Sequence, residues 1–462
     1  MPGDAHTGAG ELLGRGAAAH LTLLERAVAD SAVARVEAAR LLSALFALVE
    51  RLPSRALRQR FLLDPAFIEG LHAAAGQSRS LASWHGCIAE PSIATVWPTA
   101  APESVDRLAN SWLALLLREE PNWRGRIALR TDLCGRLRFP LSDWSIELGR
   151  AGDRPKTVLA DECVTASFAR HNVRLALPEE TDQDLLLIPR DDWLRMIVGN
   201  DGGIDGRRMS SRRSEVRVRL QFAGKIPGWQ VRYDPVAVAD ADHAGLTGGL
   251  AAAILGAIRR HSASIASEFD RIVSVVRGWE LPPAAYGTLH SFSDPTLPRV
   301  MGFNVPYTAQ DEPLVSPFCF TWFGHELGHT KSYLIETILH VLGLSLTSVH
   351  GGYTGIVKRY GRRLPIRTLL QIPYTHLYEW VLLTRALEQG FSGMPWTISD
   401  DPIALGDEIH LEIEEAFERI GREVEPTACG HAVLARLWAL SQEVLVRWQR
   451  ARGCHRFSRR GP

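Results

Sequence analysis

The chain has 462 residues, of which 46% are hydrophobic and 23% charged, and its 52 basic residues balance 52 acidic ones. The length favours two or three domains or one large elaborated domain, and the balanced charge provides no global basic field for nucleic acid. No apolar run approaches the roughly 20 residues that a membrane-spanning helix needs. The N-terminus lacks the layout of a secretion signal. We therefore expect a cytoplasmic protein with neither nucleic-acid nor membrane partners.

The first part of the chain is predicted to be helical. Apolar residues recur at three-to-four spacing over 19–52, which indicates an amphipathic helix, and Pro53 ends this run. A second helical block with short breaks is expected over 55–120. Residues 1–121 are therefore interpreted as an N-terminal helical region.

From about residue 122 the pattern changes to short β-rich runs separated by turn residues. These runs lie at 144–148, 173–177, 185–188, 216–220 and 229–233. Their spacing predicts a mostly antiparallel sheet within residues 122–240. We consider this β-rich region for peptide recognition.

The last region, 241–462, is predicted to be mainly helical and to carry the functional site. Helices are expected at 246–280, 318–342, 366–390, 407–422 and 427–452, and a short strand is expected at 300–305. The whole chain is thus expected to have an α+β fold. It would combine N-terminal helices, a central mostly antiparallel sheet and a C-terminal helical metal-binding region.

The most informative segment contains His325-Glu326-x-x-His329. Residues four apart lie on one face of a helix, so both imidazoles can reach one metal ion. Glu326 can project beside that ion, where it could accept a proton from a bound water. A helix end with hydrogen-bonded side chains and no metal is the alternative. Glu336 lies about 10 Å further along the helix axis than His329, so we interpret it as a supporting carboxylate and not as a ligand.

A third protein ligand is expected from a later element. His376 and Glu379 are three residues apart on a helix that is otherwise apolar, and Pro373 predicts that this helix starts after it. His350 lies in a loop between the two helices. We rank His376 first, Glu379 second and His350 third.

The segment from about Pro298 to Leu387 resembles the HExxH-motif peptide-modification family, whose members are understood as iron- and α-ketoglutarate-dependent β-hydroxylases of ribosomally made peptides. Three features carry the resemblance: the strand and spacer from Val300 to Pro317, the motif extended to Lys331 with an apolar tail and Glu336, and the Arg-Leu-Pro365 turn before Leu369-Leu-Gln371 and Tyr374-x-His376-Leu377. They cover about a fifth of the chain. Gly328 departs from the family pattern, in which Gln often stands.

The resemblance implies Fe(II) held by His325, His329 and His376, with α-ketoglutarate as co-substrate. Two imidazoles with a carboxylate and open positions suit Fe(II), which can then chelate a 2-oxo acid and bind O₂. Arg363 and Lys331 are the candidate cations for the distal carboxylate of α-ketoglutarate, although Lys331 points about 200° round the helix from His329. The implied reaction is β-hydroxylation of a side chain in a ribosomally synthesised precursor peptide.

Two other functions fit the same residues. Zinc with Glu326 as general base would make the chain a metallopeptidase of the HExxH type. A non-catalytic peptide-binding protein, whose metal is structural or absent, belongs to a third class. The histidine spacing alone does not separate these functions.

Overall fold

The computed structural model describes residues 4–34 and 36–74, short stretches between 108 and 222, and then 226–237, 241–279, 291–293, 299–304, 318–348, 352–357, 362–392 and 401–459. The chain divides into two compact units. One comprises Met1–Gly16 with Ile226–Pro462, and the other comprises Ala17–Lys225. The division into 1–121, 122–240 and 241–462 stays a prediction.

Helices form the first part of the Ala17–Lys225 unit. They are α1 (Asp4–Ala34, which begins in the other unit), α2 (Val36–Glu50), α3 (Arg55–Leu62) and α4 (Pro65–Ala74). The prediction that residues 19–52 are helical is confirmed, but two helices, α1 and α2, cover this range instead of one. Ser54 begins α3 as its N-cap, because its side chain accepts a hydrogen bond of 3.1 Å from the Leu57 amide.

The described strands of the same unit pair antiparallel. β1 (Ile127–Arg130) pairs with β4 (Thr157–Ala160), β5 (Val173–Ala176) with β6 (Leu186–Pro189), β7 (Met209–Ser211) with β8 (Ser214–Val216), and β3 (Trp144–Glu147) with both β2 (Arg136–Arg138) and β9 (Arg219–Phe222). Among the described residues these are separate small sheets. The single central sheet expected over 122–240 is therefore not confirmed.

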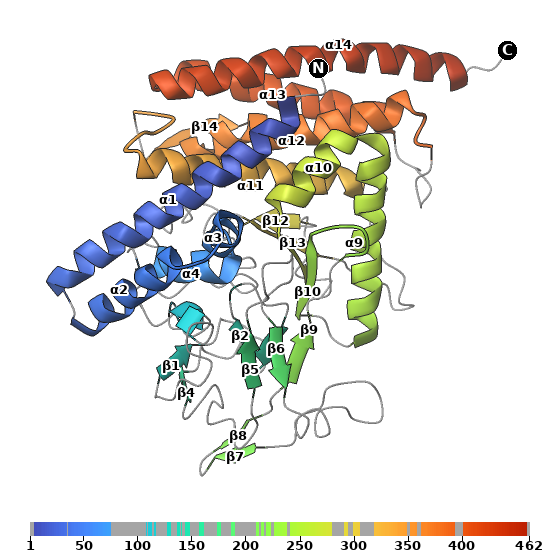
Figure 1. Cartoon of the computed structure of the whole chain (residues 1–462). Helices are drawn as coiled ribbons and strands as arrows, with labels where there is room; N and C mark the ends of the chain where they lie inside the picture. Colours follow the sequence, from blue (N-terminus) through green and yellow to red (C-terminus); the bar gives the residue numbers. More distant parts are fainter. Residues whose placement is uncertain are drawn as a thin grey trace. The chain divides into compact units, whose positions relative to one another are not determined.

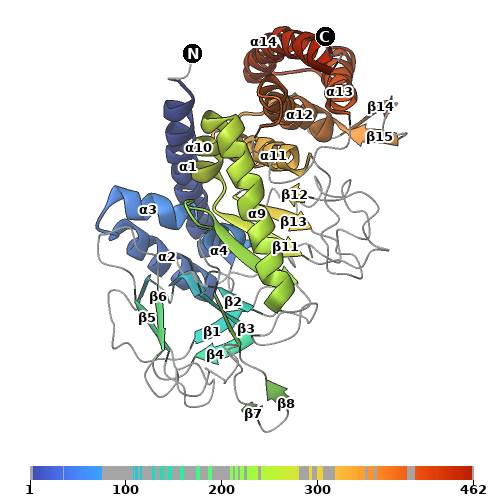
Figure 2. The ribbon, with the colours of Figure 1, turned by 90° about the vertical axis from the view of Figure 1, so that its right-hand side faces the viewer.

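A four-stranded sheet lies in the unit that carries the HExxH motif. Its order is β10 (Arg232–Ala237), β11 (Val275–Trp279), β13 (Val300–Asn304) and β12 (Ser291–Ser293). β11 runs parallel to both β10 and β13, whereas β12 pairs antiparallel with β13. Helices α9 (Ala241–His261) and α10 (Ala263–Ile272) connect β10 to β11. Figure 2 shows α9 running along this sheet.

The predicted helix over 246–280 was wrong at its end, because residues 275–279 form β11. Val275 and Val276 are both buried. A strand covered on both faces shows no alternation of apolar and polar residues, so its pattern cannot be distinguished from a buried helical turn. The predicted strand at 300–305 is confirmed as β13.

Four long helices follow the sheet. They are α11 (Cys319–Val341), α12 (Ile366–Glu388), α13 (Pro402–Glu423) and α14 (Ala428–Arg459), with the hairpin of β14 (Tyr353–Val357) and β15 (Arg362–Pro365) between the first two. All four confirm the helices predicted for this region. α12 packs against α11, α13 and α14, and Figure 1 shows these helices in layers from α14 at the top to α11.

α12 continues through Pro373, so the prediction that it starts after this residue was wrong. An internal proline removes one helix hydrogen bond and costs about 3 kcal/mol. On both sides of it, Leu369, Leu377 and Trp380 are buried. Each such side chain contributes about 1.5–3 kcal/mol, so packing outweighs the penalty.

α11 approaches α12 closely because it carries glycines at the contact. A Cβ atom at Gly324 would lie 2.6 Å from Leu382 Cδ1 and 3.3 Å from the Tyr378 carbonyl oxygen. Gly328 lies one turn further along the same face. A pair of glycines four residues apart lets two helix backbones come together more closely than larger side chains would allow.

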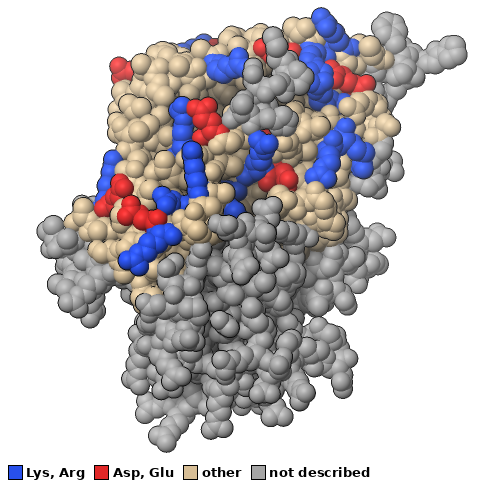
Figure 3. Space-filling view, in the orientation of Figure 1, with Lys and Arg blue, Asp and Glu red and all other residues tan. Residues whose placement is uncertain are grey.

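None of the described helices has both the length and the apolar character that crossing a membrane requires. On the face shown in Figure 3, basic and acidic side chains of the described residues are interspersed.

Candidate metal centre

α11 carries the three motif residues, of which Glu326 is buried and His325 and His329 are half-buried. The rings of His325 and His329, four residues apart, have centroids 5.0 Å apart. The His325 side chain keeps 26% of its surface exposed, whereas Glu326 is only 3% exposed. The motif helix therefore forms as predicted, and both of its imidazoles are partly exposed.

α12 brings His376 and Glu379 to the same place. Glu379 Oε2 lies 3.3 Å from His325 Nδ1 and 3.8 Å from His376 Nδ1. The ligand atoms of these three residues all lie within 4.8 Å of one another. Ligand atoms bound at about 2.1 Å stand about 3.0–3.4 Å apart in octahedral or tetrahedral sites. The cluster is thus slightly wider than a filled metal site, and its donor set fits a divalent cation.

His329 borders this cluster and stacks on Tyr333, with ring centroids 5.7 Å apart. Burial lowers the pKa of His329 well below its ordinary value, and the charges of His325, His376 and Arg367 lower it further. The imidazole is therefore neutral at physiological pH, as a metal ligand must be.

Glu379 and His325 stabilise each other's charged forms. Burial alone would lower the pKa of His325, but the hydrogen bond and the charge of Glu379 raise it, with help from Glu326. Burial alone would raise the pKa of Glu379, but His325, His376 and a hydrogen bond from Thr321 lower it. Thr321 Oγ1 donates to Glu379 Oε1 over 3.2 Å, which leaves Oε2 directed at the histidines.

Glu326 is held by two serines of the edge strand β12. Ser291 Oγ donates to Glu326 Oε1 over 2.9 Å, and Ser293 Oγ donates to Oε2. Burial raises the pKa of Glu326, while the charge of His325 and both serine hydrogen bonds oppose this rise. Both carboxylate oxygens therefore have donors within the protein.

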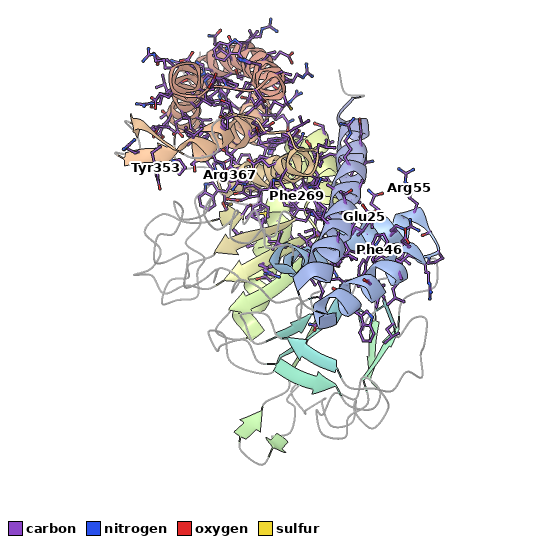
Figure 4. All side chains as sticks on the ribbon, turned by 90° about the vertical axis from the view of Figure 1, so that its left-hand side faces the viewer. Glu25, Phe46, Arg55, Phe269, Tyr353 and Arg367 are labelled. Carbon is purple, nitrogen blue, oxygen red and sulfur yellow. The ribbon has the colours of Figure 1, made fainter. Side chains whose placement is uncertain are left out.

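Glu336 lies further along α11, and its role as a supporting carboxylate stays a prediction. Its carboxylate accepts hydrogen bonds from Arg367 and, over 3.4 Å, from Gln371 Nε2. Gln371 in turn hydrogen-bonds His329. The Arg367 guanidinium lies 5.3 Å from the Tyr333 ring centroid. Figure 4 labels Arg367 near the start of α12, beside the hairpin that carries Tyr353.

Lys331 lies elsewhere. Its ammonium donates to Glu268 and, over 2.7 Å, to Tyr378 Oη, which itself donates to Glu268 over 2.8 Å. Lys331 and Tyr378 also line a cavity of about 290 Å³ whose other lining residues come from α10, α12 and α14. The opposite direction of Lys331 around α11, expected from helix geometry, explains this separation.

Arg363 is engaged within the β14–β15 hairpin. Its Nε donates to the Thr354 carbonyl over 2.9 Å, and its guanidinium lies 5.9 Å from the Tyr353 ring centroid. These contacts give Arg363 a role in the hairpin. His350, the third-ranked ligand, lies outside the described residues.

Several residues beside the candidate centre were not identified as site residues by the sequence analysis. Ser291 and Ser293 lie between the predicted helix at 246–280 and the predicted strand at 300–305, where no element was expected. The alternating Ser-Phe-Ser was the signal for a strand. Glu412 of α13, whose Oε2 lies 2.8 Å from His376 Nε2, was also missed. A carboxylate beside the apolar Ile409 and Ile413 of a predicted helix was the signal there.

Comparisons with protein families and with curated proteins found no match. A proposal for its function therefore rests on the residues of the centre and on the resemblance of the motif segment.

Proposed function

We propose that this chain is a metal-dependent oxygenase that uses Fe(II) and α-ketoglutarate to hydroxylate a side chain of a ribosomally synthesised precursor peptide. The observation that carries the proposal is the cluster of His325, His376 and Glu379, with ligand atoms within 4.8 Å of one another, beside His329. Two imidazoles with one carboxylate are the donor set of non-haem Fe(II) oxygenases. The resemblance of the motif segment to the peptide-modification family supports the peptide substrate, and a cytoplasmic setting belongs to the same proposal.

The exposure of the centre supports a catalytic role over a structural one. His325 keeps 26% of its side-chain surface exposed, compared with 12% for Glu379. A catalytic metal site keeps positions open for substrate, whereas a structural site is closed by protein ligands. This access disfavours the third function, a peptide-binding protein with a structural metal.

When bound together, Fe(II) and α-ketoglutarate would activate O₂, which could then oxidise a C–H bond of the substrate. The protein's own residues hold the ligands in place: Thr321 fixes Glu379, and Gln371 fixes His329. Ser291 and Ser293 fix Glu326 in the same way. Because both oxygens of Glu326 accept hydrogen bonds, we assign this residue to support of the centre and not to activation of water.

The distal carboxylate of α-ketoglutarate needs a cation, and Arg367 is our candidate. Its charge acts on His329, because it contributes to lowering the pKa of that residue. All three cations have partners in the protein: Glu336 for Arg367, the Thr354 carbonyl for Arg363, and Glu268 with Tyr378 for Lys331. Of the three, Arg367 is the one whose charge contributes to the pKa of His329. A guanidinium can bind a carboxylate through two parallel hydrogen bonds.

A zinc metallopeptidase is the second candidate, and one observation favours it. Burial raises the pKa of Glu326, and a carboxylate with a raised pKa is a better general base near neutral pH. In that case Glu326→Gln would keep the metal and lose all turnover. An oxygenase would show a graded loss instead, or a loss through weaker metal binding.

The deciding experiment measures the product. Protein prepared without oxygen receives Fe(II), α-ketoglutarate, O₂ and a precursor peptide encoded beside its gene. We expect an intact peptide that has gained one oxygen atom, with an equal amount of succinate. Peptide fragments that form without O₂ or α-ketoglutarate would overturn the oxygenase and establish the peptidase.

A further inference from the structure

α13 carries a buried carboxylate on a face that is otherwise apolar or small. The buried residues of this helix are Pro402, Gly406, Ile409, Glu412, Ile413, Ala416 and Ile420. Removing an ionised carboxylate from water costs several kcal/mol unless a charged or hydrogen-bonding partner compensates. The position of Glu412 therefore calls for a partner on the helix against which α13 packs.

That partner is His376 of α12. Glu412 Oε2 lies 2.8 Å from His376 Nε2, and the two side chains are 7% and 9% exposed. A neutral imidazole carries one N–H, and a carboxylate beside Nε2 favours the proton on that nitrogen, which places the lone pair on Nδ1. His376 Nδ1 is the atom that lies 3.8 Å from Glu379 Oε2. The nitrogen that can bind a metal is thus the one on the side of Glu379.

We infer that Glu412 is a positioning residue of the metal centre. Its negative charge, 2.8 Å from Nε2 of His376, favours a proton on that nitrogen and thereby directs Nδ1 toward an ion shared with His325 and Glu379. Histidines that bind metals almost always donate their other N–H to a carboxylate, a carbonyl or water, which fixes the ring and makes it a stronger ligand. This inference rests on the proposed metal centre, and it makes α13 a part of that centre.

The test measures metal affinity without substrate or turnover. Fe(II) under anaerobic conditions, and Co(II) as a coloured probe, are titrated into the full chain. Glu412→Ala should weaken binding about 10–100-fold. Glu412→Gln should lie between Glu412→Ala and the unchanged protein, because its amide oxygen can accept the same N–H without the negative charge.

Glu414→Gln is the matched control. Glu414 lies on the same helix and pairs with His410 over 3.4 Å, but its side chain is 48% exposed. We expect its metal affinity to equal that of the unchanged protein. Unfolding in denaturant shows for each variant whether the fold is kept, and the Gln variant preserves the test if Glu412→Ala does not fold.

A double-mutant cycle with His376→Ala separates positioning from a general structural role. If Glu412 acts through His376, adding Glu412→Gln to His376→Ala should change metal affinity no further. Two results would overturn the inference and leave the metal centre itself standing. One is an equal effect of Glu412→Gln on metal affinity in the unchanged protein and in His376→Ala. The other is unchanged metal affinity in both Glu412→Ala and Glu412→Gln. A protein that binds neither ion would overturn both the centre and the role of Glu412.

Discussion

Gly328 of α11 lies directly against the backbone of Thr375 on α12. A Cβ atom at Gly328 would be 2.7 Å from Thr375 Cα and 2.8 Å from the Tyr374 carbonyl oxygen. The next residues in sequence are His329 and His376, so this contact sets the separation between candidate ligands of the two helices. A glutamine has no space at this position.

Gly328→Ala should therefore lower the free energy of unfolding by about 1–3 kcal/mol through overpacking, and Gly328→Gln by more. Gly421→Ala on α13 is the control, because no atom lies within 4 Å of a Cβ added there. It should stabilise the protein by about 0.5–1 kcal/mol. Denaturant midpoints measure both effects. Equal stability of the two alanine variants would contradict the close packing of α11 on α12.

The ligand set can be read from the metal content of single variants. His325→Ala, His376→Ala and Glu379→Gln should each lower the amount of Fe(II) retained after anaerobic dialysis, because two remaining ligands hold an ion poorly. His340→Ala, at the exposed end of the same helix, should retain metal fully. Stoichiometric metal in His325→Ala would refute the centre, and tolerance of His376→Ala alone would leave a centre closed by Glu379.

Replacing Arg367 should weaken the binding of α-ketoglutarate, whereas replacing Arg363 or Lys331, the candidates from the sequence, should not. Arg367→Met should raise the dissociation constant for α-ketoglutarate at least tenfold, since a charge-assisted bidentate pair is lost. Arg363→Met should change it little. Glu336→Gln should lower the constant or leave it unchanged, because it removes the carboxylate that competes for Arg367. Titration of α-ketoglutarate into the Fe(II)-loaded protein without O₂ measures these constants, and a selective loss in Arg363→Met would reverse the assignment.

Lys331 should contribute to stability and not to co-substrate binding. Its ammonium is paired with Glu268, and the two side chains are 29% and 10% exposed. Removing one partner of such a partly buried ion pair costs more stability than in an exposed pair and less than in a fully buried one. Lys331→Met should therefore cost about 1–3 kcal/mol of unfolding free energy, with α-ketoglutarate affinity unchanged. In a cycle with Glu268→Gln, additive losses would show that the two residues do not interact.

His261 should make the fold less stable in mild acid. The ring is buried, and Nδ1 lies 2.8 Å from Gln389 Oε1. Burial lowers the pKa of His261 below 6.5, Arg260 adds to this, and the Gln389 hydrogen bond opposes it. As pH falls below 6.5, the unfolded chain therefore takes up a proton that the folded chain does not, and stability is lost by up to about 1.4 kcal/mol per pH unit.

Urea unfolding of the unchanged protein and of His261→Gln, between about pH 7.5 and about pH 5.5, tests this linkage. The variant should lose less stability over this range, because it has no proton to take up at that position. The contribution of His329, whose pKa is also lowered, is common to both proteins and cancels in the difference. Parallel curves would show that His261 does not titrate differently in the two states.

The sequence predicted the parts of the site that depend on local spacing. The four-residue spacing of His325 and His329 requires only a helix, and the periodicity of α11 and α12 is strong. The contact between the helices was not predictable, because it depends on glycines whose meaning becomes clear only when Gly328 meets Thr375.

Contacts between distant elements account for the rest. Glu412 reaches His376 from a helix that no local pattern links to the motif, and Ser291 reaches Glu326 from a strand of three residues. The short run of β11, in which Arg277 and Gly278 follow two valines, shows no alternation and did not distinguish strand from helix. Pro373 indicated a helix start, but packing on both sides of it outweighed that local signal.

The role of α13 has a consequence for biosynthesis. When His325 and His329 leave the ribosome, Glu412 has not yet been synthesised, and translation proceeds at about 5–20 residues per second. For several seconds the nascent chain therefore carries the paired imidazoles of α11 without His376 held in its binding orientation. An ion captured in this interval has incomplete ligation and exchanges readily, so selective loading has to wait until the C-terminal helices have been made.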